Sequence, residues 1–262
     1  MLQKPHTTVL AVALAAGLLS AGCNSVAATA VATAPAAGTH WVVMVDGSQS
    51  VCAAGGSQAA FWADAAGRLV FDRVSRGDTI SILRLGSASA FDAPAFEARV
   101  PIAAPGFVGA DVEMKARVDT RRVKAEAAAA FKELVSRCGR ERWSRLLDGL
   151  DRLPKRTTAN LQVLVFTDGV ESTPDFDLER VALTAETMDA LAGRVLARPG
   201  WGPDRLRGAR VTFVLPRFEH LDRAGADKVL LEAFWRRVLE SAGARLASFD
   251  NSILAADDDQ QS

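Results

Sequence analysis

Neither an excess of charge nor a familiar catalytic motif marks this chain. Its 262 residues carry 31 Lys and Arg against 31 Asp and Glu, so the chain as a whole has no strong field that favours nucleic acid or an anionic membrane over other partners. The sequence contains no G-x-S-x-G nucleophile elbow, no H-E-x-x-H zinc motif and no glycine-rich phosphate loop. It therefore lacks the signatures of the common serine hydrolases, zinc proteases and P-loop nucleotide-binding proteins.

Long apolar runs are also missing, apart from a short one near the N-terminus. There, Lys4 precedes an apolar stretch from Val9 to Leu19, which is shorter than the ~20 residues that a spanning helix needs. Small residues then lead into a cysteine, in the order Ser20-Ala21-Gly22-Cys23. This arrangement predicts that residues 1–22 are a targeting segment that is removed. It resembles the lipobox of bacterial lipoproteins, which implies that Cys23 is acylated, although serine stands at position 20, where leucine is more usual.

The lipoprotein interpretation sets the layout of the chain. Residues 23–38, dominated by alanine, lack the bulky side chains of a core and are predicted to be a tether. Residues 39–249 form the predicted domain, and residues 250–262 an acidic, polar tail. We expect a protein of the bacterial cell envelope that reaches the membrane through its N-terminal lipid. Asn24, in place of the aspartate linked with inner-membrane retention in some bacteria, favours the outer membrane. A plain secretory signal with an incidental Cys23 is the alternative.

Only three cysteines are present, which leaves two after Cys23. In an exported protein, Cys52 and Cys138 can form one intramolecular disulfide. This bond would join two loops that we expect at the same end of the sheet. Closing a loop of this size stabilises by about 4 to 5 kcal/mol in the chain-entropy model. Two buried free thiols are the alternative, because sequence separation does not fix their geometry.

The hydrophobic content of 49% is enough for one sizeable domain, in which short apolar runs typical of strands alternate with amphipathic patterns typical of helices. The predicted strands are Trp41–Val45, Thr79–Leu85, Phe96–Ile102, Leu161–Phe166, Arg210–Leu215 and Ala244–Phe249. The predicted helices are Ser57–Val74, Asp111–Cys138, Trp143–Leu153, Asp175–Ala197 and Ala226–Ala242. This order predicts an α/β fold with a doubly wound, mainly parallel sheet, helices on both faces and Phe96–Ile102 as a short antiparallel edge strand.

Two of the predicted strands end in carboxylates and hydroxyls. Asp46-Gly47-Ser48-Gln49-Ser50 follows the first strand, and Thr167-Asp168-Gly169 follows the strand Leu161–Phe166. Parallel sheets bind ligands at the carboxyl ends of their strands, in the crevice where the strand order reverses. If the two strands are neighbours, Asp46 and Asp168 meet in this crevice, where their oxygen atoms indicate a site for a hard cation.

These residues resemble the metal-ion-dependent adhesion site of von Willebrand factor A-like domains. The D-x-S-x-S pattern is formed by Asp46, Ser48 and Ser50, and Thr167-Asp168-Gly169 stands after the strand that the family places beside the first. The family's third element is a threonine on an intervening loop, which begins the pattern T-x-[LI]-x-x-A-L. Ser144 occupies the threonine position of that spacing, without the preceding glycines. Thr157 and Thr158 compete for this role, but we expect them at the amino end of the following strand, as turn residues.

The resemblance implies roles for five residues. Ser48, Ser50 and Ser144 would bind the metal directly, while Asp46 and Asp168 would act largely through water and orient the hydroxyls. Oxygen ligands suit Mg²⁺, with Mn²⁺ or Ca²⁺ as the other candidates. With mostly neutral ligands the metal retains positive charge and can accept a carboxylate from a partner protein. We therefore expect a metal-dependent protein-binding domain rather than an enzyme, with no role in binding nucleic acid.

Other interpretations of the same residues remain open. A strand that ends in Asp-Gly and serines is also ordinary turn and helix-cap chemistry, and a metal-free scaffold could bind partners through helix faces. Trp143, next to Ser144, would then be an interface candidate at the rim of the crevice. Glu171 and Asp175 are expected to be solvated loop charges.

A metal-dependent hydrolase is the third interpretation, since a metal with open positions can activate water. His40 and His220 are the candidate proton carriers, but neither has a supporting spacing. Asp46 also lacks the second aspartate of the D-x-D pattern in phosphoaspartyl hydrolases. We therefore predict no catalytic residues.

Overall fold

The computed structural model describes residues 38–52, 56–86, 93–102, 109–137, 139, 141–154, 160–217 and 225–251. All of these lie in one compact unit, Ala37–Ser262. This unit holds both hydrophobic cores described below, so it has what a domain needs to fold by itself. Within the described residues, no helix combines the length and the apolar composition that a membrane crossing requires.

Six strands form one sheet in the order β3-β2-β1-β4-β5-β6. They are β1 (His40–Asp46), β2 (Thr79–Leu85), β3 (Phe96–Arg99), β4 (Leu161–Phe166), β5 (Arg210–Val214) and β6 (Arg245–Asp250). Every pairing is parallel except β2 with β3, which is antiparallel. The predicted α/β class and the antiparallel edge strand are thus confirmed.

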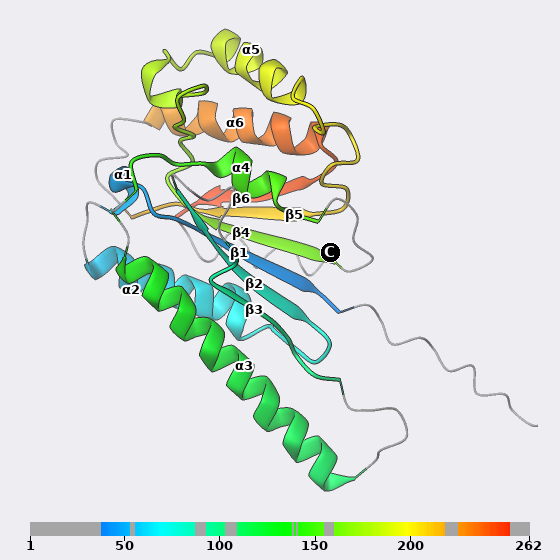
Figure 1. The fold of residues 1–262 in the computed structure, drawn as a ribbon. Helices are drawn as coiled ribbons and strands as arrows, with labels where there is room; N and C mark the ends of the chain where they lie inside the picture. The colour runs from blue at the N-terminus through cyan, green and yellow to red at the C-terminus, as the bar shows by residue number, and fades with distance from the viewer. Residues whose placement is uncertain are drawn as a thin grey trace, which may run out of the picture. The chain divides into compact units, whose positions relative to one another are not determined.

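Helices cover both faces of the sheet, with α2 and α3 on one face and α4, α5 and α6 on the other (Figure 1). The helical elements are α1 (Gln49–Cys52), α2 (Gly56–Ala66), the π-helical turn η1 (Gly67–Phe71), α3 (Ala110–Ser136), α4 (Leu146–Asp151), the 3₁₀ turn η2 (Leu178–Arg180), α5 (Ala185–Leu196) and α6 (Gly225–Ser241). The sheet is therefore the middle of three layers.

Side chains that alternate along each strand contribute to two hydrophobic cores, one on each face of the sheet. In β1, Trp41, Val43 and Val45 belong to the core under α2 and α3, whereas Val42 and Met44 belong to the core under α4, α5 and α6. Successive side chains of a strand point to opposite faces, so a continuous apolar run is what a strand buried on both faces requires. The central position of β1 follows from this composition.

One predicted helix is wrong in extent. Residues 175–197 do not form a continuous helix, because Thr173 and Phe176 close a backbone turn by exchanging hydrogen bonds of 2.9 and 3.2 Å. The chain then makes only the short turn η2 before α5 begins, where the Thr184 hydroxyl accepts from Thr187 N at 3.2 Å and caps the helix. The other predicted segments are observed, although α4 is shorter than predicted and β3 ends at Arg99.

The strand order creates a crevice between β1 and β4. From β1 the chain moves to β2 and β3 on one side of the sheet, and β4, β5 and β6 build the other side. Because the connections diverge above the carboxyl ends of β1 and β4, the loops that follow these two strands face each other. The five predicted site residues lie in these loops or beside them.

Candidate metal centre

Asp46 is the hub of a buried hydrogen-bond network at the crevice. It is the last residue of β1 and is fully buried. Its Oδ2 accepts hydrogen bonds from Ser144 Oγ at 2.6 Å and from Thr167 Oγ1 at 2.7 Å, and its Oδ1 accepts from Ser48 N at 2.9 Å. One carboxylate therefore connects three stretches of chain that are far apart in sequence.

A second arm of the network reaches Asp168. Ser48 Oγ lies 3.2 Å from Ser50 Oγ, and Ser50 Oγ donates to Asp168 Oδ2 at 2.9 Å. The other oxygen of Asp168 accepts from Val170 N at 2.9 Å. Of the five predicted residues, Ser50 alone is exposed. The structure thus brings all five together, and the network opens to solvent at Ser50.

The loop that carries Ser144 is held in place by backbone hydrogen bonds. Ser144 N donates to Ser172 Oγ at 3.0 Å, and Ser172 N donates back to Ser144 O at 2.9 Å. Upstream, the amides of Gly139 and Glu141 both donate to Gly47 O, at 3.0 and 3.2 Å. The loop is therefore tied both to the segment after β4 and to the segment after β1, which fixes the Ser144 hydroxyl over the crevice.

Thr167 is a site residue that was not predicted. In the run Thr167-Asp168-Gly169, the resemblance implies a role for Asp168 alone. Its hydroxyl donates to Asp46 and accepts from Gly169 N at 3.1 Å, so it links the two carboxylate-bearing loops. Its place directly after a buried strand, next to an aspartate, is the signal that could have identified it.

The two aspartates share an unfavourable electrostatic environment. Burial raises the pKa of Asp46, against the opposing effect of the hydrogen bonds from Ser144, Ser48 and Thr167. Burial, and then the neighbouring charge of Asp46, raise the pKa of Asp168 to about 7. Two carboxylates that disfavour each other's ionisation are stabilised by a proton or by a cation between them.

The donor set fits a hard divalent cation. All of the converging side-chain atoms are oxygens, which Mg²⁺ and Ca²⁺ prefer over the nitrogen and sulfur ligands of softer metals. The hydroxyls of Ser50 and Ser144 direct their protons to carboxylates, which leaves oxygen lone pairs available to a metal. Across the described part of the chain, no three His, Cys, Asp or Glu side chains gather into a metal cluster, so the candidate depends on its hydroxyls.

Other residues considered from the sequence lie elsewhere or differ from expectation. Glu171 is fully buried, not solvated as predicted, because its Oε2 accepts from Leu147 N at 2.9 Å at the start of α4; Asp175 is exposed. Trp143 is half-buried beneath the Arg142 guanidinium, which lies 4.9 Å from its ring centre. His40 lies at the amino end of β1, the opposite end from Asp46, with its Nε2 2.9 Å from Ser81 Oγ.

Several predictions fall outside the described residues and stay predictions. They concern the acylated Cys23, the partner thiol Cys138, and His220, Thr157 and Thr158. The side chain of Cys52 is not described either. The lipid anchor and the disulfide are therefore untested by the structure.

Comparison with known proteins gives solved structures only, since no family model and no curated protein matches. The chain is similar to proximal thread matrix protein 1 from the mussel byssus, at 13% identity and a TM-score of 0.40, over 81% of this chain and 44% of that one. A structure of the same mussel protein described as having a zinc-occupied MIDAS motif overlaps at 13% identity and a TM-score of 0.36, over 68% and 38%. The chain spans less than half the length of these mussel chains.

Two further matches cover nearly the whole of the other chain. One is the VWA domain of SpRpn10, at 11% identity and a TM-score of 0.37, over 86% of this chain and 95% of that one. The other is an aerotolerance-related membrane protein from Bacteroides fragilis, at 13% identity and a TM-score of 0.37, over 86% and 98%. These overlaps are similarities that say nothing of what this chain binds. The doubly wound strand order and the convergence of Asp46, Ser144 and Asp168 where β1 and β4 end agree with what the resemblance to von Willebrand factor A-like domains implied.

Proposed function

We propose that this chain is an exported, lipid-anchored domain of the bacterial envelope that binds a protein partner through a divalent cation at the candidate metal centre. The observation that carries the proposal is the continuous network from Ser144 through Asp46, Ser48 and Ser50 to Asp168. A network of oxygens assembled from three distant segments is a costly arrangement if its role is only to close turns, because it buries two carboxylates.

The residues divide the work between them. Ser48, Ser50 and Ser144 would hold the cation, and Asp46 and Asp168 would orient these hydroxyls and balance the charge. When bound, a cation of this kind supplies an open coordination position for a carboxylate of the partner. The exposed position of Ser50 is where a partner could reach the site. Mg²⁺ is our first candidate, with Mn²⁺ and Ca²⁺ as alternatives.

Nothing in this arrangement calls for catalysis. His40, the one described histidine that was a candidate proton carrier, is separated from Asp46 by the full length of β1. Burial lowers the pKa of His40, against the charge of Glu97, and the His40 ring contacts the Ser81 hydroxyl. We therefore propose a binding domain and not a hydrolase.

Thermal unfolding in the presence of Mg²⁺, Mn²⁺, Ca²⁺ or chelator tests the metal. A cation at a hundred times its Kd stabilises the native state by about 2.7 kcal/mol, which for a domain of this size raises the Tm by roughly 5 to 10 °C. Ser50→Ala should abolish this shift while changing the metal-free Tm little, because Ser50 is exposed. Asp46→Ala should abolish it too, at a larger cost in stability.

Ser136→Ala is the matched control. Its hydroxyl is exposed and donates to Glu133 O at the end of α3, not to a residue of the candidate metal centre, so this variant should keep the full metal shift. Melting curves that are identical with all three cations and with chelator would favour a metal-free scaffold. Turnover of a phosphate or ester substrate that is lost in Asp46→Ala would instead favour a hydrolase.

A further inference from the structure

A basic groove lies between α3 and the loop that precedes β2. It has a volume of about 590 Å³ and is lined by Ser75, Arg76, Arg117, Thr120, Arg121 and Lys124. Four of these six side chains carry positive charge. The loop enters β2 at its amino end, whereas the candidate metal centre lies at the carboxyl ends of the strands. At about 3.3 Å per residue along the seven residues of β1, the two sites are separated by ~20 Å.

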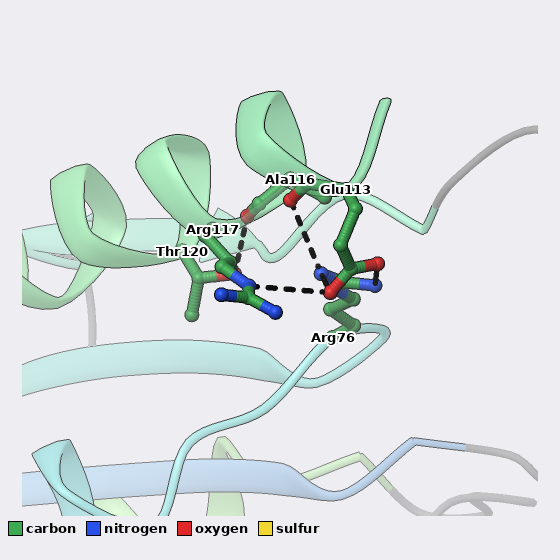
Figure 2. A network of polar contacts seen from close by, with 5 residues as sticks. All are labelled: Arg76, Glu113, Ala116, Arg117 and Thr120. Carbon is green, nitrogen blue, oxygen red and sulfur yellow. Dashed lines mark hydrogen bonds and ion pairs between the residues drawn. The ribbon is translucent and has the colours of Figure 1, made fainter. Parts of the chain in front are cut away.

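One carboxylate orders two of the four cations, as Figure 2 shows. Glu113 accepts hydrogen bonds from both terminal nitrogens of Arg76, at 2.8 and 2.6 Å, and from Arg117 Nε at 3.4 Å. The Thr120 hydroxyl on the same wall donates to Ala116 O at 2.8 Å. The single charge of Glu113 holds two guanidinium groups in the groove without neutralising both.

The other two cations stand on the next turns of α3. Lys124 Nζ donates to the backbone carbonyl of Asp72 at 3.1 Å, a contact that leaves its charge in place. Among the residues that the structure describes, no carboxylate is placed to pair with Arg121. The groove therefore carries four cations against Glu113, and its guanidinium groups suit phosphate oxygens, which they can bind in pairs.

Large apolar side chains are exposed beside the groove. Met114 and Val118, one helical turn apart on α3, are 63% and 56% exposed, and Ile102 is 47% exposed. Ile102 lies against the groove loop, because a Cβ placed on Gly77 would be 3.2 Å from its Cδ1. Exposed apolar side chains among basic ones are typical of a helix that lies at a membrane surface. A small, soluble phosphate compound would not contact these apolar side chains.

The chain enters the domain at this same end. The carboxylate of Asp78 accepts from Ser75 N at 2.8 Å and from Thr39 N at 2.7 Å, so it joins the groove loop to the first described residues. Residues 24–38 separate Thr39 from the predicted lipid on Cys23. Fully extended, a chain of this length reaches at most about 50 Å. A lipid at Cys23 would thus keep the groove close to the bilayer.

We propose that this groove is a membrane-contact site that binds the phosphate groups of anionic phospholipids. The proposal rests in part on the proposed lipid anchor, since the anchor brings the groove to the bilayer. A basic surface supplements a lipid chain in this way, because stable attachment commonly needs two signals. Each cation close to an anionic bilayer strengthens binding about fivefold.

The test uses the chain from residue 23 onward with Cys23→Ser, which cannot be acylated and keeps the whole folded unit Ala37–Ser262. Sedimentation with vesicles of phosphatidylcholine, alone or mixed with phosphatidylglycerol, measures its binding in the presence of chelator. Binding is expected only with phosphatidylglycerol and should weaken as salt is added. Arg121→Gln should reduce the affinity about fivefold, and Glu113→Gln, which frees two guanidinium groups, should increase it by a similar factor.

Arg122→Gln is the matched control, because Arg122 is the next residue of the same helix but does not line the groove. It is 61% exposed and pairs with Asp119 at 3.5 Å. The same change of charge at this position should cost clearly less affinity than at Arg121. Equal losses in both variants would show that only total charge matters and would overturn the groove as the site.

Two further results would contradict the assignment of the groove to anionic phospholipids. One is equal binding to vesicles with and without phosphatidylglycerol. The other is that glycerol phosphate or inorganic phosphate binds and Arg121→Gln weakens this binding about fivefold, while no vesicle binds. This second result would assign the groove to a small phosphate ligand. Because the protein is unacylated and free of metal in this assay, its failure leaves the metal-dependent melting shift untouched, and the reverse also holds.

Discussion

Glu171 is a buried acid whose ionisation should set how the stability of this domain depends on pH. Its Oε2 accepts from Leu147 N at 2.9 Å, and its Oε1 has no partner among the described residues. Burial raises its pKa from 4.5 to about 8; the charge of Asp148 adds to this, while the amides of α4 and Arg198 oppose it. At neutral pH the folded state therefore holds a proton on Glu171 that the unfolded chain releases.

The sign and the size of the effect follow from linkage. Between pH 4.5 and about 8 the folded state binds one more proton than the unfolded state, so the free energy of unfolding falls as the pH rises. The contribution of Glu171 to the free energy of unfolding is fully present below pH 4.5 and is lost as the pH rises through about 8. At 1.36 kcal/mol per pKa unit, a shift from 4.5 to about 8 corresponds to at most about 5 kcal/mol.

Glu171→Gln isolates this contribution. Glutamine keeps an acceptor for Leu147 N but does not titrate, so urea unfolding with chelator should give similar stabilities for both proteins near the lower end of the range. Toward the upper end the variant should become the more stable one by several kcal/mol. The raised pKa values of Asp46 and Asp168 act equally in both proteins and cancel in the difference. Parallel curves for the two proteins across this range would refute the buried, protonated Glu171.

Two further substitutions test how the site is supported. Arg205→Met should destabilise the domain by about 3 kcal/mol in urea unfolding, because the buried guanidinium of Arg205 donates to backbone carbonyls near the end of α4. Arg207→Met is the control and should change stability little, because the Arg207 side chain is 80% exposed. Gly169→Ala should cost about 2 kcal/mol or more by the same measurement, because φ is +81° and a Cβ would lie 2.6 Å from Phe249. Gly200→Ala, with φ of +89° and open space, should cost about 1 kcal/mol. Equal losses in the two members of either pair would contradict this account.

Most of the fold could be predicted because the apolar runs of the central strands are easy to identify in the sequence. The runs Trp41–Val45 and Leu161–Phe166 are apolar on both faces, a composition that only a central strand of a covered sheet requires. The helical pattern of residues 175–197 misled because its apolar spacing continues across the Thr173–Phe176 turn and the Thr184 cap. The break is set by local hydrogen bonds, namely the backbone pair of Thr173 and Phe176 and the Thr184 hydroxyl cap, and hydrophobic periodicity does not record them.

The site was predictable in its residues but not in its connections. Two motifs at strand ends were enough to place Asp46 and Asp168 together, because parallel strands bring their carboxyl ends to one edge. Thr167 and Ser172 were assigned no role, since a hydroxyl next to a motif has no spacing rule of its own. Glu171 was misjudged because a carboxylate in a loop is usually solvated, and only tertiary packing places it over the amides of α4.

The two ends of the sheet have opposite chemical character, and this has a geometric consequence. The carboxyl ends of β1 and β4 gather acidic and hydroxyl oxygens, while the amino end of β2 gathers four cations and the point where the chain enters. An anchor and an anionic bilayer at the amino end would direct the candidate metal centre away from the membrane, by about the length of β1. A partner could then reach Ser50 without displacing lipid. Loss of the cation of Arg121 should accordingly weaken vesicle binding and leave the metal-dependent Tm shift unchanged, whereas Ser50→Ala should do the reverse.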